Sequence, residues 1–186
     1  MLHFTTLINR GFVNNKQTDA VYTDFSKAFD KVNHNLLLNK LNMLGFSPKC
    51  LSWIKSYFCR RKQRVRYKNS NSKSIDVLSG VPQGSHLGPI FFSLFINDLP
   101  NVIQFSNILM YADDVKIFFS YNEISDQICL QKDLVNFFMW CRINLMDLNL
   151  DKCKFMRFSR RNLISKEFTD PYITKQLYTS LVRPIL

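Results

Sequence analysis

Residues 108–119 read ILMYADDVKIFF, so two apolar runs flank a pair of adjacent carboxylates, Asp113 and Asp114. Both runs are rich in Ile, Val, Phe and Tyr, which favour strands, and the stretch predicts a β-hairpin with the two acids at its tip. Two like charges about 4 Å apart repel by about 1 kcal/mol in water and about 4 kcal/mol at a partly buried site. A hard cation such as Mg²⁺ would relieve this repulsion. Asp is also common in plain polar turns, so the hairpin alone leaves both interpretations open.

A third acid ends a second apolar segment upstream of the hairpin. Residues 19–24 read DAVYTD and predict a short buried strand that ends at Asp24, which lies 89 residues before Asp113. If the two strand ends are neighbours, Asp24 and Asp113 could bind two metal ions about 3.5–4 Å apart, as in two-metal phosphoryl transfer. The spacing by itself does not establish that the strands are adjacent.

Local signals place the remaining elements. Asn33 suits the N-cap of a helix that ends at Gly45, and Pro48 suits the first turn of a helix that continues through Phe58. Periodicity predicts helices at about 89–99, 123–146 and 171–186 and a strand at 152–159, whereas residues 1–12 are weakly patterned. Interleaved helices and strands around an antiparallel hairpin predict an α+β fold, an antiparallel sheet with helices packed on one face.

The composition points to a folded chain with a polyanionic partner. The 186 residues carry a formal charge of +11, 46% are hydrophobic and 17 are Phe, which favours a globular domain that binds nucleic acid over a disordered segment. The longest apolar run, residues 87–96, is too short to span a bilayer. Five cysteines form no CxxC pair and give no zinc spacing with the three histidines, which predicts reduced thiols in an intracellular protein. Nothing in the sequence indicates an oligomeric state.

A basic segment follows the second helix. From Arg64 onward cations alternate with apolar residues, and a strand would place Arg64, Arg66 and Lys68 on one face. Residues 69–74 predict a turn and residues 75–78 its return strand. A run of charge is most often a solvated surface, but in so cationic a chain we expect these three side chains to contact phosphates.

Five motifs occur in the order and spacing of a known family. They are YTDFSKAFD at 22–30, SGVPQGS at 79–85, LGP at 87–89, INDLP at 96–100 and YADD at 111–114. Together they resemble the polymerase palm motifs of reverse transcriptases, in the form that these motifs take in jockey-like non-LTR retrotransposons. The resemblance implies RNA-directed DNA synthesis on an RNA template from a DNA primer and deoxynucleoside triphosphates, in the nucleus or cytoplasm. The alternative enzyme is an RNA-directed RNA polymerase with the same palm. Phe29 and the VPQG sequence argue against it.

The resemblance also assigns site residues. Asp24, Asp113 and Asp114 would be the catalytic acids and would bind two Mg²⁺ (or Mn²⁺) ions, to which the backbone carbonyl of Phe25 could add an oxygen. Phe29 matches the bulky residue beneath the incoming sugar, where it would exclude a 2′-hydroxyl; the alternative is an ordinary core phenylalanine.

Three further residues match family positions at the nucleotide. Gln83 and Gly84 match the loop against the incoming nucleotide, where Gly84 allows close backbone approach and Gln83 supplies an amide. Lys152 matches a lysine near the triphosphate that could protonate pyrophosphate, although a solvated lysine at a strand end is the plain alternative.

The chain departs from the family pattern near both ends. Residues 1–160 are expected to form a reverse transcriptase domain with the fingers largely absent, and residues 161–186 resemble a thumb-side segment found further downstream in the family. His86 stands where an aliphatic residue is usual. These departures predict a truncated or decayed copy of a mobile element that extends primers poorly by itself. A catalytically inactive, nucleic-acid-binding remnant is therefore the alternative from outside the enzymes.

Overall fold

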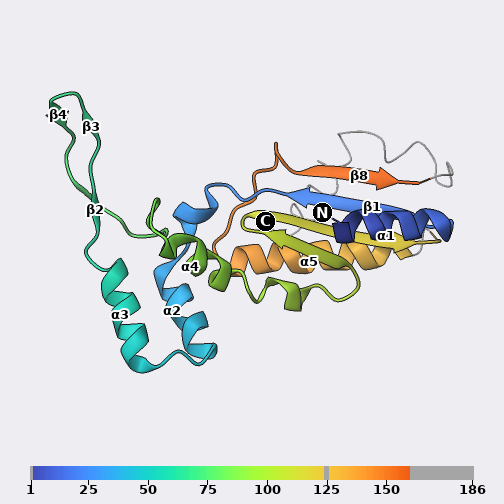
Figure 1. Cartoon of the computed structure of the whole chain (residues 1–186), viewed down its shortest axis with the longest axis horizontal. Helices are drawn as coiled ribbons and strands as arrows, with labels where there is room; N and C mark the ends of the chain where they lie inside the picture. The colour runs from blue at the N-terminus through green and yellow to red at the C-terminus, as the bar shows by residue number, and fades with distance from the viewer. Residues whose placement is uncertain (1, 124–125, 160–186) are drawn as a thin grey trace. The chain divides into compact units, whose positions relative to one another are not determined.

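The computed structural model describes residues 2–123 and 126–159 (Figure 1). The expected helix at 171–186 and the expected segment 161–186 lie outside these residues. The chain divides into two compact units, which are described separately. Of the described residues, we call 2–26, 99–123, 126–141 and 148–159 the sheet unit and 27–98 and 142–147 the helical unit. Among the described residues, no helix is both long enough and apolar enough to cross a membrane.

The sheet unit is built on an antiparallel sheet. Its strands in the described part of the chain are β1 (Gln17–Thr23), β6 (Asn107–Tyr111), β7 (Asp114–Tyr121) and β8 (Lys154–Phe158), in the order β6-β7-β1-β8. The expected hairpin is confirmed, because β6 pairs with β7 across a turn at residues 112–113. The strand expected at 19–24 is β1, which pairs with β7 on one side and β8 on the other.

Helix α1 (Leu2–Val13) covers one face of this sheet, where the sequence predicts no element. Phe4 and Ile8 form a buried cluster with Ala20 of β1 and Phe118 of β7. Phe4 also makes an edge contact with Phe158 of β8, at 5.8 Å between ring centroids. The α+β class is confirmed, and the N-terminal segment adds a helical cover to the sheet.

The opposite face carries a buried polar network beneath α5 (Gln127–Ile143). Asp19, only 2% exposed, accepts two hydrogen bonds from Arg157, at 2.9 and 3.1 Å, and one from the Tyr121 hydroxyl at 2.6 Å. Gln127 of α5 donates to the same hydroxyl. Burial and the bond to Asp19 raise the pKa of Tyr121 above its ordinary value. The network therefore ties β1, β7, β8 and α5 together through one fully partnered carboxylate.

The helical unit contains α2 (His34–Met43), α3 (Pro48–Phe58) and α4 (Leu87–Phe95), with a 3₁₀ turn, η1, at Ala28–Lys31. The expected caps are confirmed, since Asn33 accepts from two backbone N–H groups of α2 and Pro48 occupies the first turn of α3. Helix α4 begins and ends earlier in the chain than the expected 89–99. A second 3₁₀ turn, η2 (Leu99–Val102), follows it and belongs to the sheet unit. Helix α5 ends at Ile143 and not at the expected residue 146, because Leu145 adopts a left-handed backbone conformation.

A two-stranded arm leaves α3 and returns toward α4 (Figure 1). Strands β2 (Lys62–Gln63) and β5 (Ile75–Asp76) pair at its base, and β3 (Arg66–Tyr67) and β4 (Ser70–Asn71) pair at its tip. The expected single strand with Arg64, Arg66 and Lys68 on one face is wrong. The ladder is interrupted at Arg64 and Val65, and Lys68 lies in the tip turn at φ 50°.

Candidate active site

The sheet brings the predicted acids to one edge. The β1–β7 ladder pairs Thr23 with Val115, so Asp24 follows the last pair on one strand and Asp114 precedes it on the other. Asp113 lies in the turn just before β7, beside Ala112, whose φ of 51° closes the hairpin. Asp24 and Asp113 are half-buried and Asp114 is exposed. The strand ends that carry the acids are therefore neighbours, which the sequence spacing could not establish.

Residues 148–153 close around the end of β1. Leu148 forms a β-bridge with Phe25, and the Asn149 N–H donates to the Asp24 carbonyl at 2.8 Å. Lys152 follows, and its ammonium lies 3.3 Å from a carboxylate oxygen of Asp24. Lys152, which is predicted to lie near the triphosphate, and Asp24, which is predicted to bind metal, are therefore neighbours within the sheet unit. The Lys152 side chain is 66% exposed, so solvent screens this pair.

Phe25 anchors this edge through its side chain. The ring is buried and contacts Phe137 of α5 at 6.1 Å between centroids. This packing holds Phe25 in place and so fixes the position of its backbone carbonyl next to Asp24. Its predicted role as a metal ligand through that carbonyl stays a prediction.

Two residues near the acids have no predicted role in the site. Lys116, two residues after Asp114 and so on the same face of β7, lies 4.0 Å from the Phe4 ring centroid and 4.3 Å from that of Tyr22. Cys153 lies directly after Lys152, and burial raises the pKa of its thiol. The alternation of β7 could have indicated Lys116, but its aromatic partners belong to β1 and α1.

The donor set at this edge suits a hard divalent ion. Mg²⁺ is commonly held by one or two carboxylates together with substrate phosphates, and Asp24 and Asp113 are half-buried acids on adjoining strand ends. In the described part of the chain, no group of three or more His, Cys, Asp or Glu side chains is arranged to hold a metal ion by itself. Asp24 and Asp113 match in number and kind the one or two carboxylates by which proteins commonly hold Mg²⁺.

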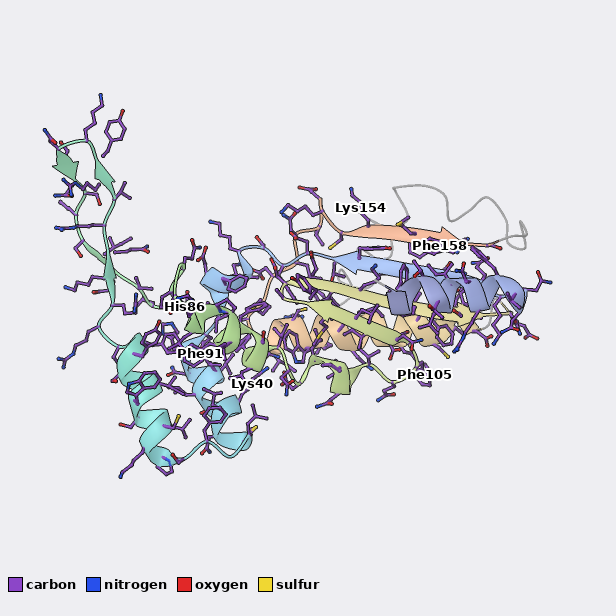
Figure 2. The ribbon with its side chains drawn as sticks, viewed as in Figure 1. Lys40, His86, Phe91, Phe105, Lys154 and Phe158 are labelled. Atoms are coloured by element: carbon purple, nitrogen blue, oxygen red, sulfur yellow. The ribbon has the colours of Figure 1, made fainter. Side chains whose placement is uncertain are left out.

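A pocket of about 470 Å³ in the helical unit gathers three of the four residues predicted at the nucleotide, and the fourth, Lys152, belongs to the sheet unit. Phe29, Gln83 and Gly84 line the pocket, and the remaining lining residues are Pro82, Ser85, His86, Gly88 and Pro89. His86 lies immediately before α4 (Figure 2). In the sequence His86 is only a departure from the family pattern, and its place in the pocket comes from the fold of the loop.

Phe29 is neither fully buried nor free. Its ring stacks on Phe92 at 4.5 Å between centroids, while the residue is half-buried and contributes to the pocket lining. Phe92 is fully buried in the core of the unit. A ring that is supported from the core side and reaches a pocket can limit the shape of a ligand there.

The loop before α4 is fixed against η1. The Val81 N–H donates to the Phe29 carbonyl at 2.8 Å, and the Gln83 amide donates to the Asp30 carboxylate at 2.9 Å. Gly80 has φ 89°, and a Cβ there would come within 2.8 Å of the Asp30 backbone. Gly84 has φ 79° but open space around its Cα, so its conformation requires glycine and leaves room for a ligand.

The three predicted phosphate-binding cations lie on the arm. Arg64 and Arg66 are exposed and two residues apart, and Lys68 at the tip turn lies 5.5 Å from the Tyr67 ring centroid. The arm therefore presents all three to solvent, although they do not share one strand face.

Comparison with known sequences gives a family match over most of the chain. The model of the family described as reverse transcriptase (RNA-dependent DNA polymerase) matches residues 5–176. The chain is 33% identical over 156 residues to a probable RNA-directed DNA polymerase from transposon BS of Drosophila melanogaster, and 30% identical over 156 residues to the polymerase of mobile element jockey from the same fly. Each alignment covers 80% of this chain, and the chain spans 17% of the length of each relative.

Solved structures share the fold at low sequence identity. Telomerase from Candida tropicalis, in complex with a fragment of telomeric RNA, aligns with a TM-score of 0.63 at 13% identity, over 83% of this chain and 29% of that one. Telomerase from Candida albicans aligns with a TM-score of 0.56 at the same identity, over 88% and 31%. The expected polymerase palm fold is thus confirmed.

Proposed function

Because this chain belongs to the reverse transcriptase (RNA-dependent DNA polymerase) family, we propose that it is the palm-bearing segment of an RNA-directed DNA polymerase of a jockey-like non-LTR retrotransposon. The observation that carries the proposal is the pairing of β1 with β7, which sets Asp24 beside the Asp113–Asp114 turn. Residues 1–160 would form the polymerase domain, and residues 161–186 would belong to a thumb-side segment.

The acids at the strand ends have the metal-binding role in this proposal. Asp24, Asp113 and Asp114, with the Phe25 carbonyl, would hold two Mg²⁺ or Mn²⁺ ions. When bound, such ions would activate the primer 3′-hydroxyl and neutralise charge on the phosphates of the incoming nucleotide. The acids themselves fix where the cations sit, and the ladder that holds their backbones limits movement of the two strand ends. Lys152 would donate a proton to the leaving pyrophosphate.

The pocket before α4 is proposed to take the incoming deoxynucleotide. Gln83 would hydrogen-bond the nucleotide through its amide, and Gly84 would let the backbone approach it. Phe29, held on Phe92, would lie under the sugar and leave neither space nor a hydrogen-bond partner for a 2′-hydroxyl. Arg64, Arg66 and Lys68 would contact phosphates of the RNA template or the DNA primer.

Primer extension by a chimera tests the catalytic role. Residues 5–160 would replace the corresponding segment of the jockey polymerase of Drosophila melanogaster, and extension of a DNA primer on an RNA template would be measured with Mg²⁺. We expect extension by the chimera and a loss of at least about 100-fold with Asp113→Asn, because a neutral amide binds Mg²⁺ far more weakly than the carboxylate that would hold the ions at the reacting phosphate.

Glu123→Gln, just after β7, is the matched control, since it neutralises an exposed acid that has no part in the proposed site or the arm. Full activity of the Asp113→Asn chimera would refute the assignment of the acids. A chimera that binds template and primer but never extends would favour the alternative of a nucleic-acid-binding segment without catalysis.

The sugar-selection role of Phe29 has its own test. In the same chimera, Phe29→Val should raise incorporation of ribonucleotides relative to deoxynucleotides by about 10-fold or more, since discrimination by shape in an apolar site is worth roughly 1–3 kcal/mol. Phe91→Val, in the same helix as the supporting Phe92 but outside the pocket lining, controls for loss of packing. If both variants keep the original sugar preference, Phe29 is only a core residue.

A further inference from the structure

An aromatic ladder on the outer side of α3 continues into the basic arm. Trp53, Tyr57 and Arg61 are spaced four residues apart, so they lie one above the next on a helix and its exit. The Trp53 and Tyr57 rings stack at 6.0 Å between centroids and 24° between planes. The Arg61 guanidinium lies 5.5 Å from the Tyr57 ring centroid. We call these three side chains the stacking ladder.

The buried face of α3 is formed by residues outside the stacking ladder. Ile54 and Phe58 are the buried residues of that helix, at 2% and 3% exposure, whereas Trp53 is 54% exposed. An indole with half of its surface in water gives up much of the stability that its burial would provide. Its position is therefore better suited to an external contact than to packing.

Tyr57 holds the ladder in a fixed orientation. Its hydroxyl hydrogen-bonds the Ser85 hydroxyl at 2.7 Å, and its ring contacts Phe58 at 5.3 Å and Phe91 at 5.9 Å between centroids. Phe91 is buried in the middle of α4 (Figure 2). Trp53 is thus stacked on a ring that is anchored on three sides, so little side-chain entropy remains to be lost when a planar ligand stacks on it.

The charge beside the ladder indicates the ligand. Residues 60–78 contain seven Lys or Arg and a single acid, Asp76. Helix α3 adds the exposed Lys49 and Lys55 and contains no acid. A flat exposed aromatic ring next to a strongly cationic arm is the combination that single-stranded nucleic acids bind, since bases stack on the ring and phosphates pair with the cations.

We propose that the stacking ladder binds an unpaired segment of a nucleic acid strand, with a base stacked on Trp53 and the neighbouring phosphates on Arg61 and the arm. A base-paired duplex offers no free base face to the indole, so the site selects single strands. The proposal rests on the proposed function, in which the occupant is the unpaired part of the RNA template. The ladder adds a contact by base stacking to the phosphate contacts of Arg64, Arg66 and Lys68.

Intrinsic fluorescence tests the stacking directly, because Trp53 and Trp140 are the two tryptophans of the chain and Trp140 is only 4% exposed. The full chain and its Trp140→Phe variant would be titrated with a 12-nucleotide oligouridine, a 12-base-pair RNA duplex, and heparin. We expect the single strand to quench emission in both proteins, and the duplex and heparin to leave it nearly unchanged. Equal quenching by heparin, which has charge but no bases, would overturn the proposal.

Affinity supplies the second measurement. Trp53→Leu should weaken binding of the oligouridine by about 5-fold to 100-fold, the range that loss of one stacked base produces, and Trp53→Phe should recover part of it. Phe105→Leu removes another exposed aromatic side chain, from the sheet unit, and should leave binding unchanged. Emission from the buried Trp140 reports whether each Trp53 variant is folded.

The outcomes separate this inference from the proposed function. Binding of oligouridine that is equal in folded Trp53→Leu and in the unaltered chain overturns the stacking ladder and leaves the polymerase proposal standing. Stacking that persists in a chimera unable to extend primers supports the ladder and refutes only catalysis.

Discussion

The chain contains two antiparallel hairpins that differ in what supports them. The β6–β7 hairpin is continued by β1 and β8 into a sheet, and β7 places Val115, Ile117 and Phe118 in the core at 2% exposure or less. The arm pairs two residues at a time, and every residue of its strands is exposed. One hairpin is held by burial of β7 on both faces, and the other by a few backbone hydrogen bonds.

This difference matches the roles that we propose for the two regions. Isolated two-stranded hairpins are marginally stable in water, whereas sheets with a packed face are stable on their own. Acids that share metal ions must be held to within a fraction of an ångström, and the acids proposed for that role lie at the ends of the packed strands β1 and β7. Phosphate contact tolerates movement because it depends on charge more than on geometry, and the exposed arm carries the cations.

The largest expected contrast is in aromatic residues of the two hairpins. Phe118→Ala should lower the free energy of unfolding by about 3–5 kcal/mol, because it removes a ring that is 1% exposed between α1 and the sheet. Tyr67→Ala on the arm, where the ring is 71% exposed, should change it by about 0.5 kcal/mol or less. Urea denaturation followed by circular dichroism measures both, and similar losses would contradict the contrast drawn between the hairpins.

An intermediate effect is expected at the far end of β7. Tyr121→Phe should cost about 1–3 kcal/mol at neutral pH, because the hydroxyl that donates to buried Asp19 is lost. The difference should shrink above pH 10. The unfolded tyrosine loses its proton near pH 10, but the folded one keeps it since its pKa is raised, so the folded state binds more protons and its stability falls as the pH rises.

The check is unfolding of both proteins between pH 7 and pH 11. Ionisation of other groups affects both curves alike, so the gap between them isolates Tyr121. A gap that stays constant above pH 10 would mean that the folded and unfolded tyrosines titrate together.

The smallest effect on stability, and the clearest on binding, is expected on the arm. Replacing Arg64, Arg66 and Lys68 by Gln should change the free energy of unfolding by about 0.5 kcal/mol or less. If about five phosphates are contacted, log K for a nucleic acid should fall with log salt at a slope of roughly −3.5 to −4.5, and the triple variant should reduce that slope by about 2–3.

A triple Gln variant at Arg10, Lys16 and Lys132 of the sheet unit is the control, since it removes equal charge outside the arm. Equal salt slopes for the arm variant and the unaltered chain would remove the arm from the interface.

Much of the local structure could be predicted because its signals are contained in a few consecutive residues. The adjacent acids between two apolar runs indicated the β6–β7 hairpin, and Asn33 and Pro48 marked the starts of α2 and α3. Helix α1 was missed because its apolar residues Phe4 and Ile8 are buried only by packing against Ala20 and Phe118, which come later in the chain. The strand expected through Lys68 failed because alternation cannot show where a hairpin turns.

The sequence by itself determined which side chains are available for chemistry, namely Asp24, Asp113, Asp114, Phe29 and Gln83, since motif wording and residue type are local properties. The tertiary structure decided which of them meet. Pairing of β1 with β7 joins strand ends 89 residues apart, and the hydrogen bonds of residues 79–83 to η1 gather Phe29 and Gln83 in one pocket. Such pairings depend on the cooperative burial of Ala20, Ile117 and Phe118. No single stretch of sequence contains that energy, so only the folded chain could reveal the sites.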